Sequence, residues 1–98
     1  MDNDVIELRE AVVDEVETLL DRFEESIGNE TPYIRSNLMR ARDQIQNEGE
    51  FLYNIQLALQ QMQSYSGSVR NDAGHNSVMA RVDELSESIQ AKAQETPR

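Results

Sequence analysis

Acidic side chains are the most regularly spaced reactive groups in this sequence. Six of them follow one another at steps of three and four residues, which places them along one ridge of a helix. Such a ridge is either a solvated helix face or an electrostatic docking strip for a basic partner, which would be a protein groove or a site that normally holds nucleic acid. The acidic ridge consists of Glu7, Glu10, Asp14, Glu17, Asp21 and Glu24.

Residues suited to catalysis or metal binding are scarce. The chain of 98 residues has no cysteine, and its one histidine, His75, falls in a polar stretch. The sequence contains no phosphate-binding glycine loop, no nucleophile elbow and no calcium loop. Acid and base catalysis by two carboxyl groups needs a pocket that moves their pKa values apart, and so short a chain has little interior to form one. We therefore predict a protein that is not an enzyme, with no cofactor, no metal and no small-molecule substrate.

The net charge of −10 is concentrated near the N-terminus. Residues 1–30 carry eleven acidic residues and two arginines, and the rest of the chain is nearly neutral. Direct nucleic-acid binding needs a basic stripe, which this chain lacks. No segment approaches the ~20 apolar residues of a membrane span, and the first residues are acidic where a signal peptide is basic. These features predict a location in the cytoplasm, or within a particle assembled there, without membrane binding.

Apolar residues repeat every seven positions over residues 3–27, which predicts a first helix. Asp4 and Glu7 resemble a capping box at its start, and Gly28 stands where a left-handed C-terminal cap belongs. The apolar stripe is three columns wide, as is typical of a helix that packs on more than one neighbour. Its seam consists of Ile6, Val13, Leu20 and Ile27, with Val5, Val12 and Leu19 beside it.

Two further helices are predicted. Thr31 and Pro32 form a helix start signal, and the seven-residue repeat then continues through Gly49, which favours one long central helix over residues 32–64. Residues 64–77 are rich in serine, glycine and asparagine and are predicted to be a polar loop. A third helix is expected over residues 77–94, and residues 95–98 should fray.

These elements predict a single all-α domain over residues 1–98, an antiparallel three-helix bundle or helical hairpin built on the long central helix. Folding about the turn at residues 28–31 predicts which charged residues of the first two helices meet. Two pairs are exposed and fix the register, and a third interrupts the apolar seams and is expected to be partly buried. The pairs are Glu24 with Arg35, Glu17 with Arg42, and Arg9 with Glu48.

A domain of this size buries little apolar area, so partners are expected to supply more. The leading hypothesis is a non-catalytic structural or adaptor subunit that works through helix–helix contacts in a homo-oligomer or larger assembly, such as a viral particle or secretion machinery. The alternative is an acidic inhibitor that mimics nucleic acid and blocks a basic groove. Association is expected to use exposed apolar residues more than the acidic ridge, and the candidates are Tyr33, Phe51, Tyr53, Leu57 and Tyr65.

A second alternative comes from a family resemblance. Tyr65-Ser66-Gly67 resembles the aromatic-x-Gly turn of the WXG100 family, and the length and helical content are similar to those of its members. The family's tryptophan is absent, and the tripeptide lies well past the middle of the chain. The resemblance implies a small secreted helical hairpin.

Overall fold

The computed structural model describes residues 2–65 and 73–95, with side chains for residues 4–65 and 73–92. Within these residues the regular secondary structure is all helical and consists of α1 (Asp2–Ile27), α2 (Pro32–Asp43), α3 (Glu48–Gln63) and α4 (Ala73–Glu95). The prediction of an all-α fold is confirmed. The predicted number of three helices is wrong, because the described residues form four.

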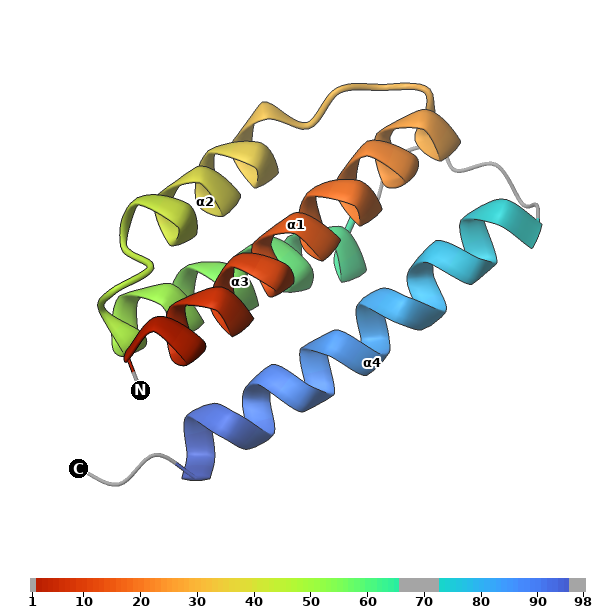
Figure 1. Ribbon diagram of the computed structural model, residues 1–98. Coiled ribbons are helices and arrows are strands. Elements are labelled where there is room, and N and C mark those ends of the chain that lie inside the picture. Colours follow the sequence, from red (N-terminus) through yellow and green to blue (C-terminus); the bar gives the residue numbers. More distant parts are fainter. Residues whose placement is uncertain (1, 66–72, 96–98) are drawn as a thin grey trace.

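Successive helices of the described part run in opposite directions, as in an up-down-up-down bundle (Figure 1). α1 packs against α2 and α4, and each of these packs against α3, so the helices surround one core. The start of α1, the turn between α2 and α3, and the end of α4 lie at the same end of the bundle (Figure 1).

The predicted central helix is two helices. α2 ends at Asp43, and α3 begins at Glu48 after Asn47, whose side-chain oxygen accepts a hydrogen bond from the Glu50 amide at 3.1 Å. This side-chain cap supplies a partner to an amide that would lack one at the start of a helix. The seven-residue repeat continues across the break because both helices of an antiparallel pair turn their apolar faces toward the same core. A continuous repeat therefore fits a hairpin as well as one long helix.

The bounds of α1 agree with the prediction of residues 3–27 to within one residue, but the predicted start motif is wrong. Gly28 has a φ of +69°, and the Asn29 amide donates to the Glu24 carbonyl at 3.1 Å, the pattern of a Schellman cap. Asp4 is not a cap, because α1 already includes Asp2. The spacing of apolar residues predicts the position of this helix more reliably than the motif at its start does.

The last helix begins earlier than predicted. α4 starts at Ala73, so residues 73–77 of the predicted polar loop are helical, and Glu95 belongs to α4. Ser64 and Tyr65 follow the end of α3. The remainder of the predicted loop, at 66–72, and of the predicted frayed tail, at 96–98, lies outside the described residues.

All the helices contribute to the core. Two buried asparagines lie beside it and are paired: Asn37 Nδ2 donates to Gln61 Oε1 at 2.6 Å, and Asn54 Nδ2 donates to the Glu50 backbone carbonyl at 2.8 Å. Among the described side chains, no buried nitrogen or oxygen lacks a hydrogen-bond partner, which is the condition for burying polar groups without penalty. The core residues are Val13, Val16, Leu19, Leu20, Phe23, Ile34, Leu38, Ala41, Phe51, Ile55, Ala58, Leu59, Met62, Val78, Val82, Leu85 and Ile89.

Candidate functional site

The acidic ridge of α1 mostly faces α2. Two arginines of α2 each contact two ridge carboxylates. Arg35 Nη2 lies 2.9 Å from Asp21 Oδ1 and 2.6 Å from Glu24 Oε1, and Arg42 Nη2 lies 3.9 Å from Asp14 Oδ1 and 3.2 Å from Glu17 Oε1. The structure therefore brings together both predicted register pairs, Glu24 with Arg35 and Glu17 with Arg42. The ridge acids Glu7 and Glu10 are exposed.

Glu24 is the most constrained of these carboxylates. Its Oε2 accepts hydrogen bonds from the Thr31 amide at 2.7 Å and the Thr31 hydroxyl at 2.9 Å, and its Oε1 accepts the bond from Arg35. Burial raises the pKa of Glu24, but the bonds from Thr31 and Arg35 outweigh that effect and leave the pKa below its usual value. Thr31 precedes α2 as predicted, but its hydroxyl accepts no bond from an amide of α2 and donates to Glu24 Oε2.

Arg9 also bridges helices, although the pair it forms with Glu48 is looser than predicted. Arg9 Nη1 donates to the Ile45 carbonyl at 2.8 Å, and Nη2 lies 3.5 Å from Glu48 Oε2. The guanidinium carbon also lies 5.7 Å from the centroid of the Phe51 ring. The Arg9 side chain is 15% exposed and that of Glu48 is 50% exposed, so only the arginine is buried to the degree expected of the pair.

The apolar residues predicted to meet a partner divide between the core and the surface. Phe51 is 2% exposed and belongs to the core, and the Arg9 side chain of α1 lies over its ring, so the expectation that it lies at the surface is wrong. Tyr65 packs edge-on against Phe23, with ring centroids 5.4 Å apart, and is partly buried. Tyr33 and Tyr53 are exposed, and Leu57 is half-buried.

His75 lies in the first turns of α4, where sequence reasoning placed a loop. Its Nδ1 is 2.7 Å from Ser26 Oγ, and that hydroxyl is 2.8 Å from the Phe23 carbonyl. The contact between His75 and Ser26 links the end of α1 to the start of α4.

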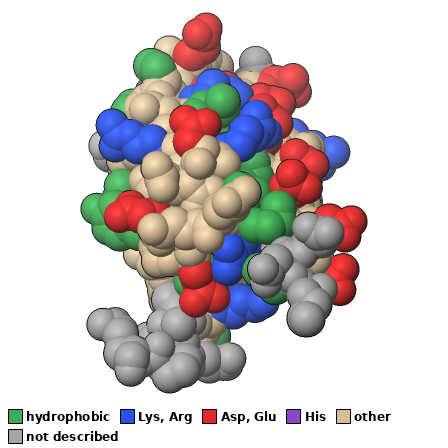
Figure 2. All heavy atoms as spheres, turned by 60° about the vertical axis from the view of Figure 1, so that its left-hand side comes forward, with side chains coloured by type: hydrophobic (Ala, Val, Ile, Leu, Met, Phe, Trp, Pro, Cys, Tyr) green, Lys and Arg blue, Asp and Glu red, His purple; other side chains and the backbone are tan. Residues whose placement is uncertain are grey.

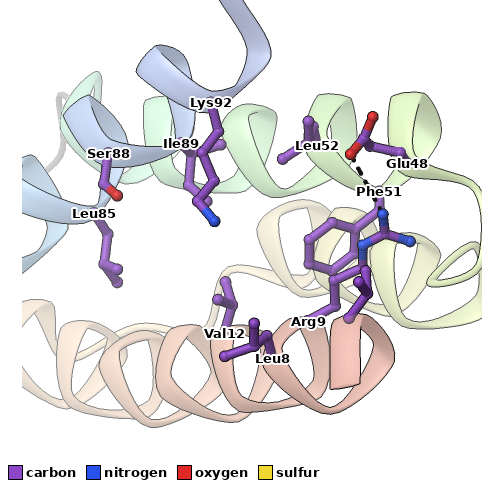
Figure 3. A pocket seen from close by; sticks show the side chains of 11 residues that line it. Leu8, Arg9, Val12, Glu48, Phe51, Leu52, Leu85, Ser88, Ile89 and Lys92 are labelled. Atoms are coloured by element: carbon purple, nitrogen blue, oxygen red, sulfur yellow. Dashed lines mark hydrogen bonds and ion pairs between the residues drawn. The ribbon is translucent and has the colours of Figure 1, made fainter. Parts of the chain in front are cut away.

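A hollow lies between α1, α3 and α4. It is a groove of about 450 Å³ at the end of the bundle where α1 begins and α4 ends. Leu8 and Val12 of α1 form one wall and Leu85 and Ile89 of α4 form the other, with Phe51 and Leu52 of α3 between them (Figure 3). The remaining lining residues are Val5, Arg9, Glu48, Ser88 and Lys92.

The groove begins where a charged contact between α1 and α4 ends. Arg81 of α4 makes two hydrogen bonds to the Glu15 carboxylate, one of them at 2.9 Å, and this contact lowers the pKa of Glu15. Beyond it, toward the start of α1, Val5 is 43% exposed and Leu8 is 64% exposed. Figure 2 shows that this end of the molecule carries hydrophobic side chains among acidic and basic ones.

Sequence reasoning found only part of this groove. Val5 and Val12 were assigned to a widened seam, but Leu8, which lies outside the seven-residue repeat, was not singled out. The available signal was the spacing of residues 5, 8 and 12, which places three apolar side chains on one face of α1. Leu85 and Ile89 of α4 belong to the core and also line the groove.

Compared with models of protein families, with curated proteins and with solved structures, the chain gave no match. No helix of the described residues has the length and apolar character that crossing a membrane requires. In the same residues, no three side chains of His, Asp or Glu are grouped so that they could hold a metal ion.

Proposed function

We propose that this protein is a non-catalytic structural or adaptor subunit that acts through helix–helix contacts. The observation that carries the proposal is the open apolar groove between α1, α3 and α4, with Val5 and Leu8 exposed beside it. Apolar side chains that line an exposed hollow contribute to stability only when a partner covers them. Two helices with apolar side chains at helical spacing form a seat for a further helix.

The charges of the molecule support an apolar docking route over an electrostatic one. Four of the six ridge acids contact arginines of α2, and two of them, Glu17 and Glu24, are partly buried where α1 packs on α2. A nucleic-acid mimic needs its carboxylates free to meet a basic groove. Reversing the charge of Asp14, Glu17 or Asp21 would disturb these contacts between α1 and α2. A loss of binding in such a variant would therefore reflect a change in the fold more than a loss of docking.

Site-specific photocrosslinking in cells of the source organism tests the proposal. Photoreactive p-benzoylphenylalanine replaces Leu8 in the full chain or, as the control, Ser36, which is exposed on α2 away from the groove. We expect a discrete crosslinked protein from position 8 and none from position 36. Adding Val5→Glu to the position-8 variant should abolish the product.

The proposal fails if position 8 gives no discrete product. It also fails if Val5→Glu leaves the product unchanged while circular dichroism shows the same helix content. The Val5→Glu comparison is needed because an exposed apolar side chain can trap proteins without a specific site.

A further inference from the structure

The two turns that lie inside the described residues are built differently. The turn after α1 begins with Gly28, at a φ of +69°, and is followed by Pro32, and these two residues are typical of a helix end and a helix start. The turn between α2 and α3, residues 44–47, contains no glycine, no proline and no positive φ (Figure 1). Its residue types therefore do not prevent a helix from running through it.

The backbone of the α2–α3 turn departs little from a helix. The Gln44 amide still donates to the Arg40 carbonyl at 2.9 Å, four residues back, as in an α-helix. The Asn47 amide donates to the Gln44 carbonyl at 2.9 Å, three residues back. Asn47 is extended, with a φ of −103° and a ψ of +105°. Rotations about a few backbone bonds, centred on Asn47, would therefore join α2 and α3 into one helix.

The apolar repeat passes through the turn without a change of period. Leu38 of α2, Ile45 of the turn and Leu52 of α3 are spaced by seven residues, and Ile45 packs against the core. A helix over residues 32–63 would therefore carry an unbroken apolar stripe, which is the pattern that a buried helix needs.

Two side chains supply the hydrogen bonds that the break in the helix removes. Arg9 Nη1 donates to the Ile45 carbonyl at 2.8 Å, and Asn47 Oδ1 accepts from the Glu50 amide at 3.1 Å. In a continuous helix the Ile45 carbonyl accepts from the Gly49 amide, and the Glu50 amide donates to the carbonyl four residues back. These backbone groups are therefore paired in the hairpin and in the straight helix.

Straightening would separate α2 from α3 and expose the apolar faces that pack between them. It would also part Asn37 of α2 from Gln61 of α3. A second copy of the same chain offers an identical α3 surface, so it can restore each of these contacts. The contacts between α1 and α2, such as the pair of Glu24 with Arg35, stay within one chain, and so do those between α3 and α4.

From these observations we infer that the α2–α3 turn is a hinge, and that two copies of this chain exchange their α1–α2 units when it straightens into one helix over residues 32–63. In the exchanged dimer the α1–α2 unit of each chain packs on the α3–α4 unit of the other. The inference goes beyond the proposed function and does not depend on what occupies the groove.

Glu48→Pro distinguishes the two forms. Position 48 is the first of α3, where an amide has no partner within the helix, and Asn47 before it is extended, as the residue before a proline prefers. The hairpin should therefore accept the proline. In a continuous helix the same proline removes a hydrogen bond and clashes with the preceding turn. Glu48→Ala is the matched control, because it removes the same side chain and permits both forms.

Sedimentation velocity on the full chain, over a concentration series in about 0.5 M sodium chloride to screen the charge repulsion between copies, measures the dimer. We expect the wild type to pass from a species of 11.2 kDa to one of twice that mass. Glu48→Pro should raise the dimer dissociation constant at least about 100-fold, and Glu48→Ala should leave it within about fivefold. Asn47→Ala, which removes the cap of the hairpin, should lower it at least about tenfold.

A distance within one chain tests the exchange itself. The chain has no cysteine, so Ser36→Cys and Gln60→Cys place two spin labels at exposed positions of α2 and α3. The doubly labelled chain is refolded with an excess of unlabelled chain, so that a dimer holds one labelled copy. Pulsed electron paramagnetic resonance should give ~36 Å in the dimer, at ~1.5 Å per residue of straight helix, and a shorter distance in the monomer.

Three results would overturn the inference. One is that the wild type and Asn47→Ala both stay monomeric at every concentration. The second is a dimer that Glu48→Pro leaves as tight as the wild type, and the third is a dimer whose label distance equals that of the monomer. If circular dichroism shows that Glu48→Pro has lost helix content, the label distance in the dimer decides alone.

Discussion

The Glu24 carboxylate joins three parts of the chain. It belongs to the last turns of α1, accepts two hydrogen bonds from Thr31 in the turn, and accepts a third from Arg35 on α2. Hydrogen bonds to a charged acceptor are stronger than those between neutral groups. Glu24 therefore fixes the angle at which α2 leaves the turn.

Acid should remove this contribution. A carboxyl group whose pKa is lower in the folded state stabilises the fold above its unfolded pKa, and the contribution is lost as the pH falls through the folded pKa. We expect Glu24→Gln to lower the free energy of unfolding by about 1 kcal/mol at pH 7. The difference from wild type should shrink between about pH 5 and pH 3.

Urea unfolding at a series of pH values measures the effect of Glu24→Gln. The control is Glu87→Gln, which removes the same charge at an exposed position of α4. A constant difference between wild type and Glu24→Gln from pH 7 to pH 3 would show that the ionised carboxylate contributes nothing.

Arg9 and Glu48 should be unequal partners. Arg9 is held mainly by the Ile45 carbonyl at 2.8 Å, and Glu48 is half exposed at 3.5 Å. We expect Arg9→Met to cost about 1–2 kcal/mol and Glu48→Gln less than about 0.5 kcal/mol. A double-mutant cycle by urea unfolding should give a coupling below about 0.5 kcal/mol, and a coupling above about 1 kcal/mol would mean that the ion pair dominates.

The sequence predicted residue contacts where helical geometry determines them. Glu24 and Arg35, like Glu17 and Arg42, meet because both pairs lie at matching distances from the turn at residues 28–31. The partner of the Thr31 hydroxyl was not predictable in the same way. The hydroxyl of a threonine before a helix can accept a bond from a helix amide and can donate one to a carboxylate, and whether a carboxylate is within reach depends on where Glu24 lies in space.

At the scale of elements, the break between α2 and α3 is where sequence reasoning failed. The heptad pattern records which residues face the core, and it does not record whether the chain reverses direction between two such residues. The polar run that contains Asn47 and Gly49 was the better signal, since Asn47 caps α3. The groove escaped prediction for a related reason: Leu8 lies outside the pattern, and its exposure depends on how α4 packs on α1.

Two substitutions at the start of α3 should have opposite effects. Asn47→Ala removes the cap and should lower the free energy of unfolding by about 1 kcal/mol. A Cβ at Gly49 would lie 3.7 Å from Asn47 Oδ1, an ordinary contact, so Gly49→Ala should stabilise the protein by about 0.5–1 kcal/mol. Thermal unfolding measures both, with Gln46→Ala, exposed in the turn, as the control; stabilisation by Asn47→Ala would contradict the cap.

At the scale of the whole molecule, arginines join α1 to each of the other helices. Arg35 and Arg42 reach it from α2, Arg81 reaches it from α4, and Arg9 extends from α1 to Glu48 of α3. Several of the chain's arginines are therefore used to hold α1, which is its most acidic segment. These contacts do not cancel the net charge of −10, which acts on the fold as self-repulsion.

Salt should stabilise the molecule. Exposed ion pairs contribute ~0–1 kcal/mol each and weaken with screening, whereas the repulsion within a chain of net charge −10 is screened at the same time. We expect the melting temperature to rise between about 0.05 M and 0.5 M sodium chloride. Circular dichroism melts measure it, and a falling melting temperature would show that the arginine contacts outweigh the repulsion.

The ends of the bundle have a practical consequence for handling the protein. The first turn of α1 and the last turn of α4 lie at the same end (Figure 1), which is the end where the groove opens. A purification tag or fluorescent fusion on either terminus would emerge beside Val5 and Leu8 and compete with whatever covers them. Binding assays on tagged protein should therefore underestimate affinity, and cleaving the tag before measurement should restore it.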